Sequence, residues 1–115
     1  MKILICLFFL LTSCATWTAG DTVRESSWVV INTIDWGQTL EMAKNPNEFK
    51  EHNPILGNHP SQGKVNVYMA SSTLAHIGVS ALLPQNIRPW WQYITIGFSG
   101  ACVINNLRAG IGVSF

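Results

Sequence analysis

The chain has 115 residues, of which 48% are hydrophobic and only 11% are charged, and its formal net charge is +1. That length accommodates one small domain, and the near-neutral balance gives no electrostatic reason to expect nucleic acid as a partner. No acidic residue follows Glu51, and the only Lys or Arg residues after it are Lys64, Arg88 and Arg108. A water-exposed surface normally carries about a quarter or more charged residues. The second half of the chain does not supply such a surface.

The chain begins with the pattern of a secretory signal peptide. Lys2 precedes the apolar run ILICLFFLL, which is too short to span a bilayer permanently. The following LTSC resembles the lipobox of bacterial lipoproteins, and this resemblance implies that Cys14 becomes the lipidated first residue of the mature protein. The alternative is an ordinary signal peptide that contains a cysteine. We therefore expect a signal peptide over residues 1–13, a lipidated tether over 14–22, and a place in the bacterial cell envelope.

A first helix is predicted over residues 23–44. Thr22 and Glu25 have the spacing of a capping box at its start, and Pro46 disfavours helical geometry at the preceding residue. A loop of about twenty residues, rich in Pro and Gly, follows, and connections of that length are usually functional or disordered.

The loop contains a candidate motif around the sequence HNPILGNHP. Its members are His52, Asn53, Pro54 and His59. No spacing in the chain resembles a structural zinc motif, so we expect neither a metal ion nor a cofactor. The favoured interpretation is a turn that packs its apolar residues against the end of the helices.

Two further helices are predicted over residues 65–83 and 89–107. Both segments lack a formal charge and have the length of a transmembrane helix. Each of the three predicted helices carries one polar stripe at helical spacing. The stripes are Asn32, Asp35 and Thr39 in the first helix, Ser72, His76 and Ser80 in the second, and Gln92, Thr95, Ser99, Cys102 and Asn106 in the third.

These stripes consist mostly of small, uncharged hydrogen-bonding groups, which are the groups that hold helices together in lipid. The predicted fold class is therefore all-α, a small three-helix bundle over residues 23–115, embedded in a membrane with its stripes turned inward. The first helix is the most polar, so it either lies at the membrane interface or inserts only with its neighbours. The glycine-containing tail after residue 107 is expected to fray.

Asp35 needs a partner in such a bundle, because a carboxylate in lipid costs several kilocalories per mole unless it is paired or protonated. His76 and Asn106 are the candidate partners. The structural interpretation is an Asp35–His76 hydrogen bond that fixes helix register. The functional interpretation is that Asp35 and His76 form a proton relay or a small intramembrane active site. The predicted buried polar cluster comprises Asn32, Asp35, Thr39, His76, Asn105 and Asn106.

The segments NTIDWGQT and EHNPILG, followed by two apolar stretches of which the second ends in NN, resemble a family of small three-helix bacterial membrane proteins of unknown function. The matching positions are Asn32, Asp35, Thr39, Asn53, Pro54 and either Asn105 or Asn106. The likeness covers most of residues 28–107. It implies the fold and nothing about chemistry.

Three functions remain open on the sequence. The first is a non-enzymatic, lipid-anchored envelope protein whose partners are membrane lipid and another envelope component that it binds or blocks. The second is an intramembrane enzyme or proton-coupled device centred on Asp35 and His76. The third is a soluble periplasmic helical lipoprotein. Spanning helices would place the protein in the inner membrane, and a soluble bundle would place it at the periplasmic face of the outer membrane.

Overall fold

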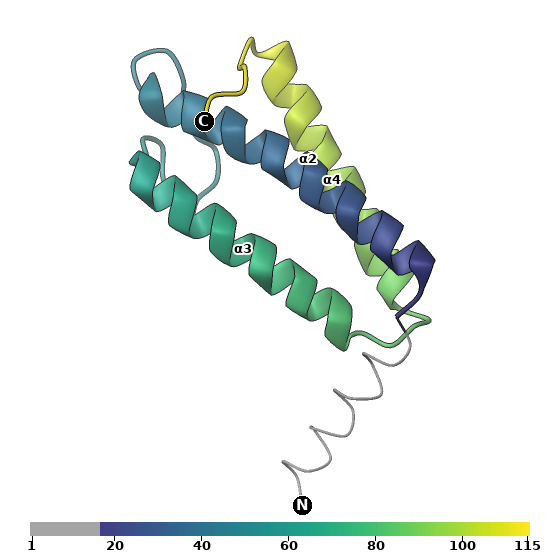
Figure 1. Ribbon diagram of the computed structural model, residues 1–115. Helices are drawn as coiled ribbons and strands as arrows, with labels where there is room; N and C mark the ends of the chain where they lie inside the picture. Colours follow the sequence, from purple (N-terminus) through teal and green to yellow (C-terminus); the bar gives the residue numbers. More distant parts are fainter. Residues whose placement is uncertain (1–16) are drawn as a thin grey trace, which may run out of the picture.

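The computed structural model describes residues 17–115, which form three α-helices and no strand. They are α2 (Ala19–Lys44), α3 (Gln62–Leu82) and α4 (Arg88–Arg108). Figure 1 shows α2 lying against both of the others, and its contacts are most extensive with α4. Contacts between α3 and α4 are few. The prediction of an all-α, three-helix fold is confirmed, with α2 as the helix that holds the other two. The predicted signal peptide and the lipidation site at Cys14 lie outside the described residues.

The first helix begins one turn earlier than predicted. Thr18 is its N-cap: the Thr18 hydroxyl accepts a hydrogen bond from the backbone N–H of Asp21, and the Asp21 carboxylate accepts one from the N–H of Thr18. The predicted capping box of Thr22 and Glu25 is therefore wrong, because an equivalent pair precedes it by one turn. Asp21 belongs to the helix and not to a tether, and Glu25 is free to turn into the bundle. The predicted end at Lys44 is confirmed.

The other two helices lie within three residues of their predicted limits. The hydroxyl of Ser61 caps α3 by accepting a hydrogen bond from the N–H of Lys64. Leu83 has extended geometry, as expected for a residue before proline. At the start of α4 a proline occupies the first turn, where a missing N–H is tolerated.

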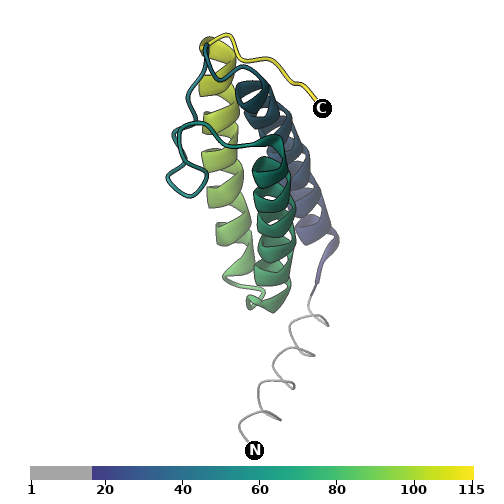
Figure 2. The ribbon, with the colours of Figure 1, turned by 90° about the vertical axis from the view of Figure 1, so that its left-hand side faces the viewer.

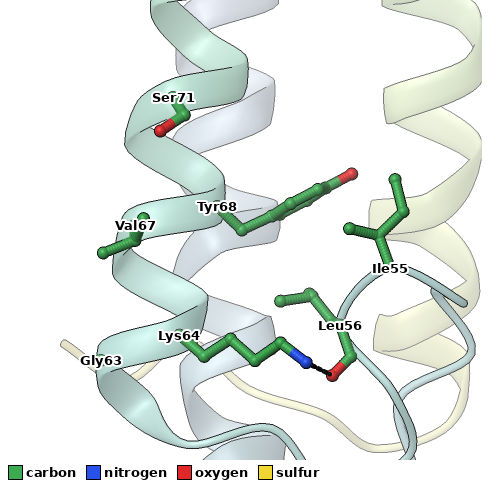
Figure 3. A pocket seen from close by; sticks show the side chains of 7 residues that line it. All are labelled: Ile55, Leu56, Gly63, Lys64, Val67, Tyr68 and Ser71. Atoms are coloured by element: carbon green, nitrogen blue, oxygen red, sulfur yellow. Dashed lines mark hydrogen bonds between the residues drawn. The ribbon is translucent and has the colours of Figure 1, made fainter.

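The loop between α2 and α3 is packed against the helices. Its Leu56 is 2% exposed and joins a core cluster with Leu40 of α2 and Val65 and Met69 of α3. Figure 3 shows Tyr68 of α3 extending toward the loop. Tyr68 lines a cavity of about 430 Å³ between α3 and the loop. The Lys64 ammonium donates a hydrogen bond to the Leu56 carbonyl at 2.8 Å. The favoured interpretation of the loop as a packed turn is thus confirmed for Leu56, whereas Ile55 is exposed.

Within residues 17–115, no helix combines the length and the hydropathy that crossing a membrane requires. The segments over residues 65–83 and 89–107, which were predicted to span a membrane, therefore do not meet the requirements for a membrane-spanning helix. Both observed helices, α3 and α4, are 21 residues long, so length is sufficient. The polar stripes that recur at every turn are what lower their hydropathy.

The C-terminal tail does not fray but folds back along α2. Gly110, with a φ of 81°, ends α4 in a left-handed turn: its N–H bonds the Leu107 carbonyl, and the N–H of Ile111 bonds the Asn106 carbonyl. The side chain of Ile111 is buried, and the N–H of Ser114 donates to the carbonyl of Gly37 at 3.0 Å. The turn at Gly110 therefore directs the tail onto the middle of α2.

The tail can lie there only because position 37 is glycine. A Cβ at this position would come within 2.4 Å of Val113 and 2.8 Å of Phe115. We predict that Gly37→Ala lowers the free energy of unfolding by about 1 kcal/mol, because overpacking costs about 1–3 kcal/mol and alanine restores only roughly 1 kcal/mol of helix propensity. Urea unfolding followed by circular dichroism measures this change, and hydrogen exchange at the Ser114 amide reports whether the tail has moved.

Gly97→Ala is the matched control, because nothing lies within 4 Å of a Cβ there. This substitution should stabilise the protein by roughly 0.5–1 kcal/mol. If Gly37→Ala stabilised the protein as much as Gly97→Ala does, the tail would not pack closely against position 37.

Candidate functional site

A network of buried charged and amide side chains fills the bundle where α2 and α4 begin. Arg88 is 0% exposed and donates hydrogen bonds to the Asp21 carboxylate at 2.9 Å, to the Ser80 carbonyl at 2.6 Å and to the Leu83 carbonyl at 2.8 Å. Burial by itself raises the pKa of Asp21, but hydrogen bonds from Thr18, Arg88 and Arg24 outweigh it and hold this pKa below its usual value. This end of the bundle therefore contains an ionised and paired carboxylate.

The same network continues from Glu25 to His76. One Glu25 oxygen accepts a hydrogen bond from the Gln92 amide at 2.9 Å, and the other lies 2.7 Å from His76 Nδ1. His76 Nε2 lies 2.8 Å from the Thr95 hydroxyl. Trp28 stacks on the imidazole at a centroid distance of 3.6 Å and an interplanar angle of 7°. His76 is thus fixed by contacts on both ring nitrogens and on one face.

The predicted Asp35–His76 hydrogen bond is wrong, because the partner of His76 is Glu25. Asp35 lies ten residues after Glu25 in the same helix, which corresponds to about 15 Å along the helix axis. The polar stripes do face the interior, but the helices are displaced along their axes relative to the predicted pairing.

Glu25, His76 and Thr95 repeat the carboxylate–imidazole–hydroxyl order of a hydrolase triad. The Thr95 oxygen, however, is also within 2.8 Å of the Trp91 carbonyl and 3.1 Å of the Gln92 carbonyl. Thr95 does not line either of two surface cavities, of about 430 and 860 Å³. A nucleophile needs adjacent space for the reacting atom of a substrate. The arrangement orients His76 and joins three helices.

A larger cavity lies at the opposite end of the bundle, between α2, α3, α4 and the loop of residues 45–61. We call it the loop-covered cavity; its volume is about 860 Å³. Figure 2 shows the loop passing from α2 toward α4 before it returns to α3. Most of the predicted site residues line this cavity: Asn32, Asp35, Thr39, His52, Asn53, Pro54, Asn105 and Asn106.

Asp35 faces this cavity with one hydrogen-bond donor. The Asn106 amide donates to the Asp35 carboxylate at 3.2 Å and to the Gln38 side chain at 3.1 Å, so the predicted Asp35–Asn106 contact is confirmed. Burial, with a smaller contribution from the negative charge of Glu51, raises the pKa of Asp35 to about 6. Burial and the charges of Asp35 and Glu51 likewise raise the pKa of the Cys102 thiol.

The remaining predicted residues have local structural contacts. Asn32 donates to the Thr73 hydroxyl and so joins α2 to α3, and Thr39 donates to the backbone carbonyl of Asp35. Asn53 donates to the Tyr68 hydroxyl and fixes the loop on α3. Four residues are exposed: His52, Pro54, His59 and Asn105. In the part of the chain that the structure describes, no group of three His, Cys, Asp or Glu side chains could hold a metal ion.

The buried network contains residues that the sequence argument did not select. They are Asp21, Glu25 and Arg88, with Trp28 and Trp91 around the histidine; Gln92 was placed in the third polar stripe but not in the predicted cluster. One signal was available: Asp21, Glu25, Trp28 and Asn32 continue the first polar stripe toward the N-terminus at intervals of three and four residues. Arg88 gives no such signal, because a basic residue before a proline is equally typical of an exposed helix start.

The fold and its two sites define a small all-α bundle with a polar interior. No family model matches the chain, and neither does any curated protein or any solved structure. The resemblance of residues 28–107 to small three-helix bacterial membrane proteins therefore stays a prediction.

The Asp21–Arg88 pair yields a first test of the buried network. We predict that Asp21→Asn lowers the free energy of unfolding by about 3–5 kcal/mol, because it leaves a fully buried guanidinium without its carboxylate. Glu41→Gln is the control, since it also removes a negative charge from α2 but at a partly exposed site that bonds Asn45. Glu41→Gln should lower the free energy of unfolding by less than about 1 kcal/mol. Equal losses in urea unfolding of the two variants would contradict a structural role for the buried pair.

The raised pKa of Asp35 yields a second test. Between its ordinary pKa of 3.8 and about 6, the folded protein binds the Asp35 proton more tightly than the unfolded chain does. Stability should therefore fall as the pH rises through this window, by at most about 3 kcal/mol. Asp35→Asn removes the titrating group and keeps a polar side chain beside Asn106. We predict that this variant is more stable than the parent chain at neutral pH.

Other titratable groups line the same cavity: Glu48, Lys50, Glu51, His52, Tyr68 and Cys102. The measurement is therefore the difference in unfolding free energy between the parent chain and Asp35→Asn across the pH range, in which the contributions of these groups largely cancel. A difference that stayed constant from about pH 4 to neutral pH would show that the pKa of Asp35 is not raised.

Proposed function

We propose that this chain is a non-enzymatic, lipid-anchored protein of the bacterial envelope, whose helical bundle rests against membrane lipid and binds or blocks another envelope component. One observation carries the proposal: many charged and amide side chains are buried inside the bundle, whereas many large apolar side chains are exposed on the outer faces of its helices.

Large apolar side chains cover the outer faces of all three helices. Leu74 of α3 is 72% exposed and Phe98 of α4 is 73% exposed. Others with more than half of their surface exposed are Val23, Val30, Val67, Leu82, Trp90, Tyr93, Ile94, Ile104 and Leu107. Soluble monomers rarely expose large contiguous apolar patches, and extensive exposed apolar surface usually marks contact with lipid or protein.

The interior contains many polar side chains beside its buried apolar ones. Its buried polar residues include Asp21, Glu25, Asn32, Gln38, Thr39, His76, Ser80, Arg88 and Gln92. In water, burying these groups would gain little and exposing the apolar ones would cost free energy. In contact with lipid, apolar outer faces are favourable and interhelical hydrogen bonds become a main source of helix association. Lipidation at Cys14 would bring the bundle to the membrane, and its outer surface would then remain there.

The alternative of an enzyme or proton-coupled device on Asp35 and His76 required these residues to act together. His76 is engaged by Glu25 and Thr95, and Asp35 lies at the other end of the bundle beside Asn106. This separation favours the non-enzymatic proposal. The alternative of a soluble periplasmic lipoprotein differs in one respect, which is what holds the protein to membranes.

Membrane extraction distinguishes these alternatives. Cys14→Ser, made with a cleavable signal peptide, lacks the acylation site, and we predict that it stays in the membrane pellet after alkaline carbonate treatment. Adding Leu74→Lys, Ile94→Lys and Phe98→Lys to Cys14→Ser should release the protein, because each lysine places a charge on the apolar surface, where burial in lipid costs roughly 2–4 kcal/mol.

The control adds the same three charges outside the helices, through Asn47→Lys, Asn58→Lys and Gln85→Lys at exposed positions of the connections. This variant should remain in the pellet, and circular dichroism should show that all variants are helical. Release of Cys14→Ser alone would mean that the lipid is the only anchor, and would overturn the proposed contact between the bundle and the membrane.

A further inference from the structure

We infer that the loop-covered cavity is a binding site for a small amphiphilic amine, with its ammonium group paired with Asp35 and its apolar body against Trp28, Met69 and Phe98. The volume of about 860 Å³ lies within the usual range for small-molecule sites, about 300–1,000 Å³. The site does not depend on whether the bundle contacts lipid.

The cavity is preformed, because its cover is fixed to the helices. Leu56 is embedded in the core cluster, and Asn53 is hydrogen-bonded to the Tyr68 hydroxyl at 2.9 Å. The Glu51 carboxylate accepts hydrogen bonds from the N–H groups of His52 and Asn53, which sets the turn above the cavity. A site that is ordered before binding loses less conformational entropy when a ligand enters.

Asp35 supplies the recognition element for a cation. Asn106 donates to Oδ1 of Asp35, and within residues 17–115 no hydrogen bond to its Oδ2 and no salt bridge to its carboxylate is formed. The Oδ2 atom keeps some exposed surface, because the described residues contain no fully buried polar side-chain atom without a partner, and Asp35 lines the cavity. A carboxylate with one weak neutral donor and one accessible oxygen can accept a charge-assisted hydrogen bond.

The surrounding charges favour a cation over an anion. The formally charged side chains on the cavity wall are Asp35, Glu48, Glu51 and Lys50. Glu51 acts on Asp35 with the same sign of charge, as the raised pKa of Asp35 shows. Lys50 is exposed on the loop and forms no salt bridge with Asp35. An ammonium group beside Asp35 would relieve the repulsion between the two carboxylates.

The apolar part of the cavity wall accommodates the rest of an amphiphile. Trp28 and Met69 are buried at the sides, whereas Phe98 is largely exposed at the edge. Hydroxyl and amide groups from Thr39, Ser72 and Asn105 lie on the same wall and can bond a polar substituent. A mixed wall with few polar groups around one charge is typical of sites that orient a small organic ligand.

Asp35 is unfavourable for folding in the absence of such a ligand. Its raised pKa means that the folded protein resists ionising it, whereas the paired Asp21 at the other end shows the opposite shift. Functional sites often contain groups that reduce stability, because ligand binding and not folding satisfies them. A primary ammonium on an apolar body occurs both in free amines and in aminolipid headgroups, so the experiment has an arm for each.

The first arm uses phenylbutylamine, with phenylbutanol and phenylbutanoate as ligands of the same apolar body. Binding is measured by calorimetry on the full lipid-anchored protein in a non-ionic detergent. We expect the amine to bind at least about tenfold more tightly than the alcohol, because a charge-assisted hydrogen bond exceeds a neutral one by roughly that factor, and the carboxylate to bind most weakly. Asp35→Asn should abolish the preference for the amine and leave the alcohol unchanged.

Glu41→Gln is the control variant, because it removes one negative charge from α2 at a residue that does not line the cavity. It should keep the preference for the amine. The second arm measures whether dihexanoyl phosphatidylethanolamine or its choline analogue displaces phenylbutylamine. Displacement by the ethanolamine lipid alone identifies a lipid source, and displacement by neither identifies a free amine.

Equal binding of amine and alcohol to the parent protein would overturn the inference. The same conclusion would follow if Asp35→Asn and Glu41→Gln reduced amine binding equally, because the effect would then be one of net charge and not of the cavity. Displacement by the ethanolamine and choline lipids alike would also overturn it, since a quaternary ammonium cannot donate the hydrogen bond to Asp35.

Discussion

The buried ion pair of Asp21 and Arg88 sets the register of the bundle. It joins the first turn of α2 to the first residue of α4, and Arg88 also bonds the carbonyls of Ser80 and Leu83 at the end of α3. A buried guanidinium without its partner is strongly destabilising, so alternative axial positions of these helices are excluded. In this register the Glu25 carboxylate lies within hydrogen-bond distance of His76 and Gln92. The same register brings Asn106 within hydrogen-bond distance of Asp35.

The two ends of the bundle use the same kinds of residue for different purposes. At the end with the ion pair, the carboxylates of Asp21 and Glu25 each have an arginine or histidine partner. At the other end, Asp35 has only an amide donor and faces the cavity under the loop. Full satisfaction of buried polar groups stabilises and specifies a fold, whereas an unsatisfied one is retained where a ligand or a reaction requires it. The contrast supports a functional role for the polar residues at the loop end and a structural role for those at the other end.

Helical periodicity was enough to predict the number of helices and the inward-facing stripes, and Pro46 was enough to predict the end of α2 at Lys44, because each depends on residues close in sequence. It could not predict which polar residues pair between helices. The predicted Asp35–His76 contact placed both residues on the correct faces but at the wrong height, since axial displacement is fixed by Asp21 and Arg88. The start of α2 was missed by one turn because Thr18–Asp21 and Thr22–Glu25 have the same spacing. The packing of the tail on Gly37 depends on contacts distant in sequence.

The length of the loop follows from the way that α2 holds its neighbours. Because α2 packs against both α3 and α4 while those two helices touch little, the bundle is open on one side near the loop. A short connection from α2 to α3 would leave that side uncovered. The chain instead continues through Phe49, Ile55 and Leu56, which line the cavity, before Ser61 caps α3. The connection is therefore long because it forms a wall of the cavity, and Leu56 and Asn53 are the residues that hold this wall in place.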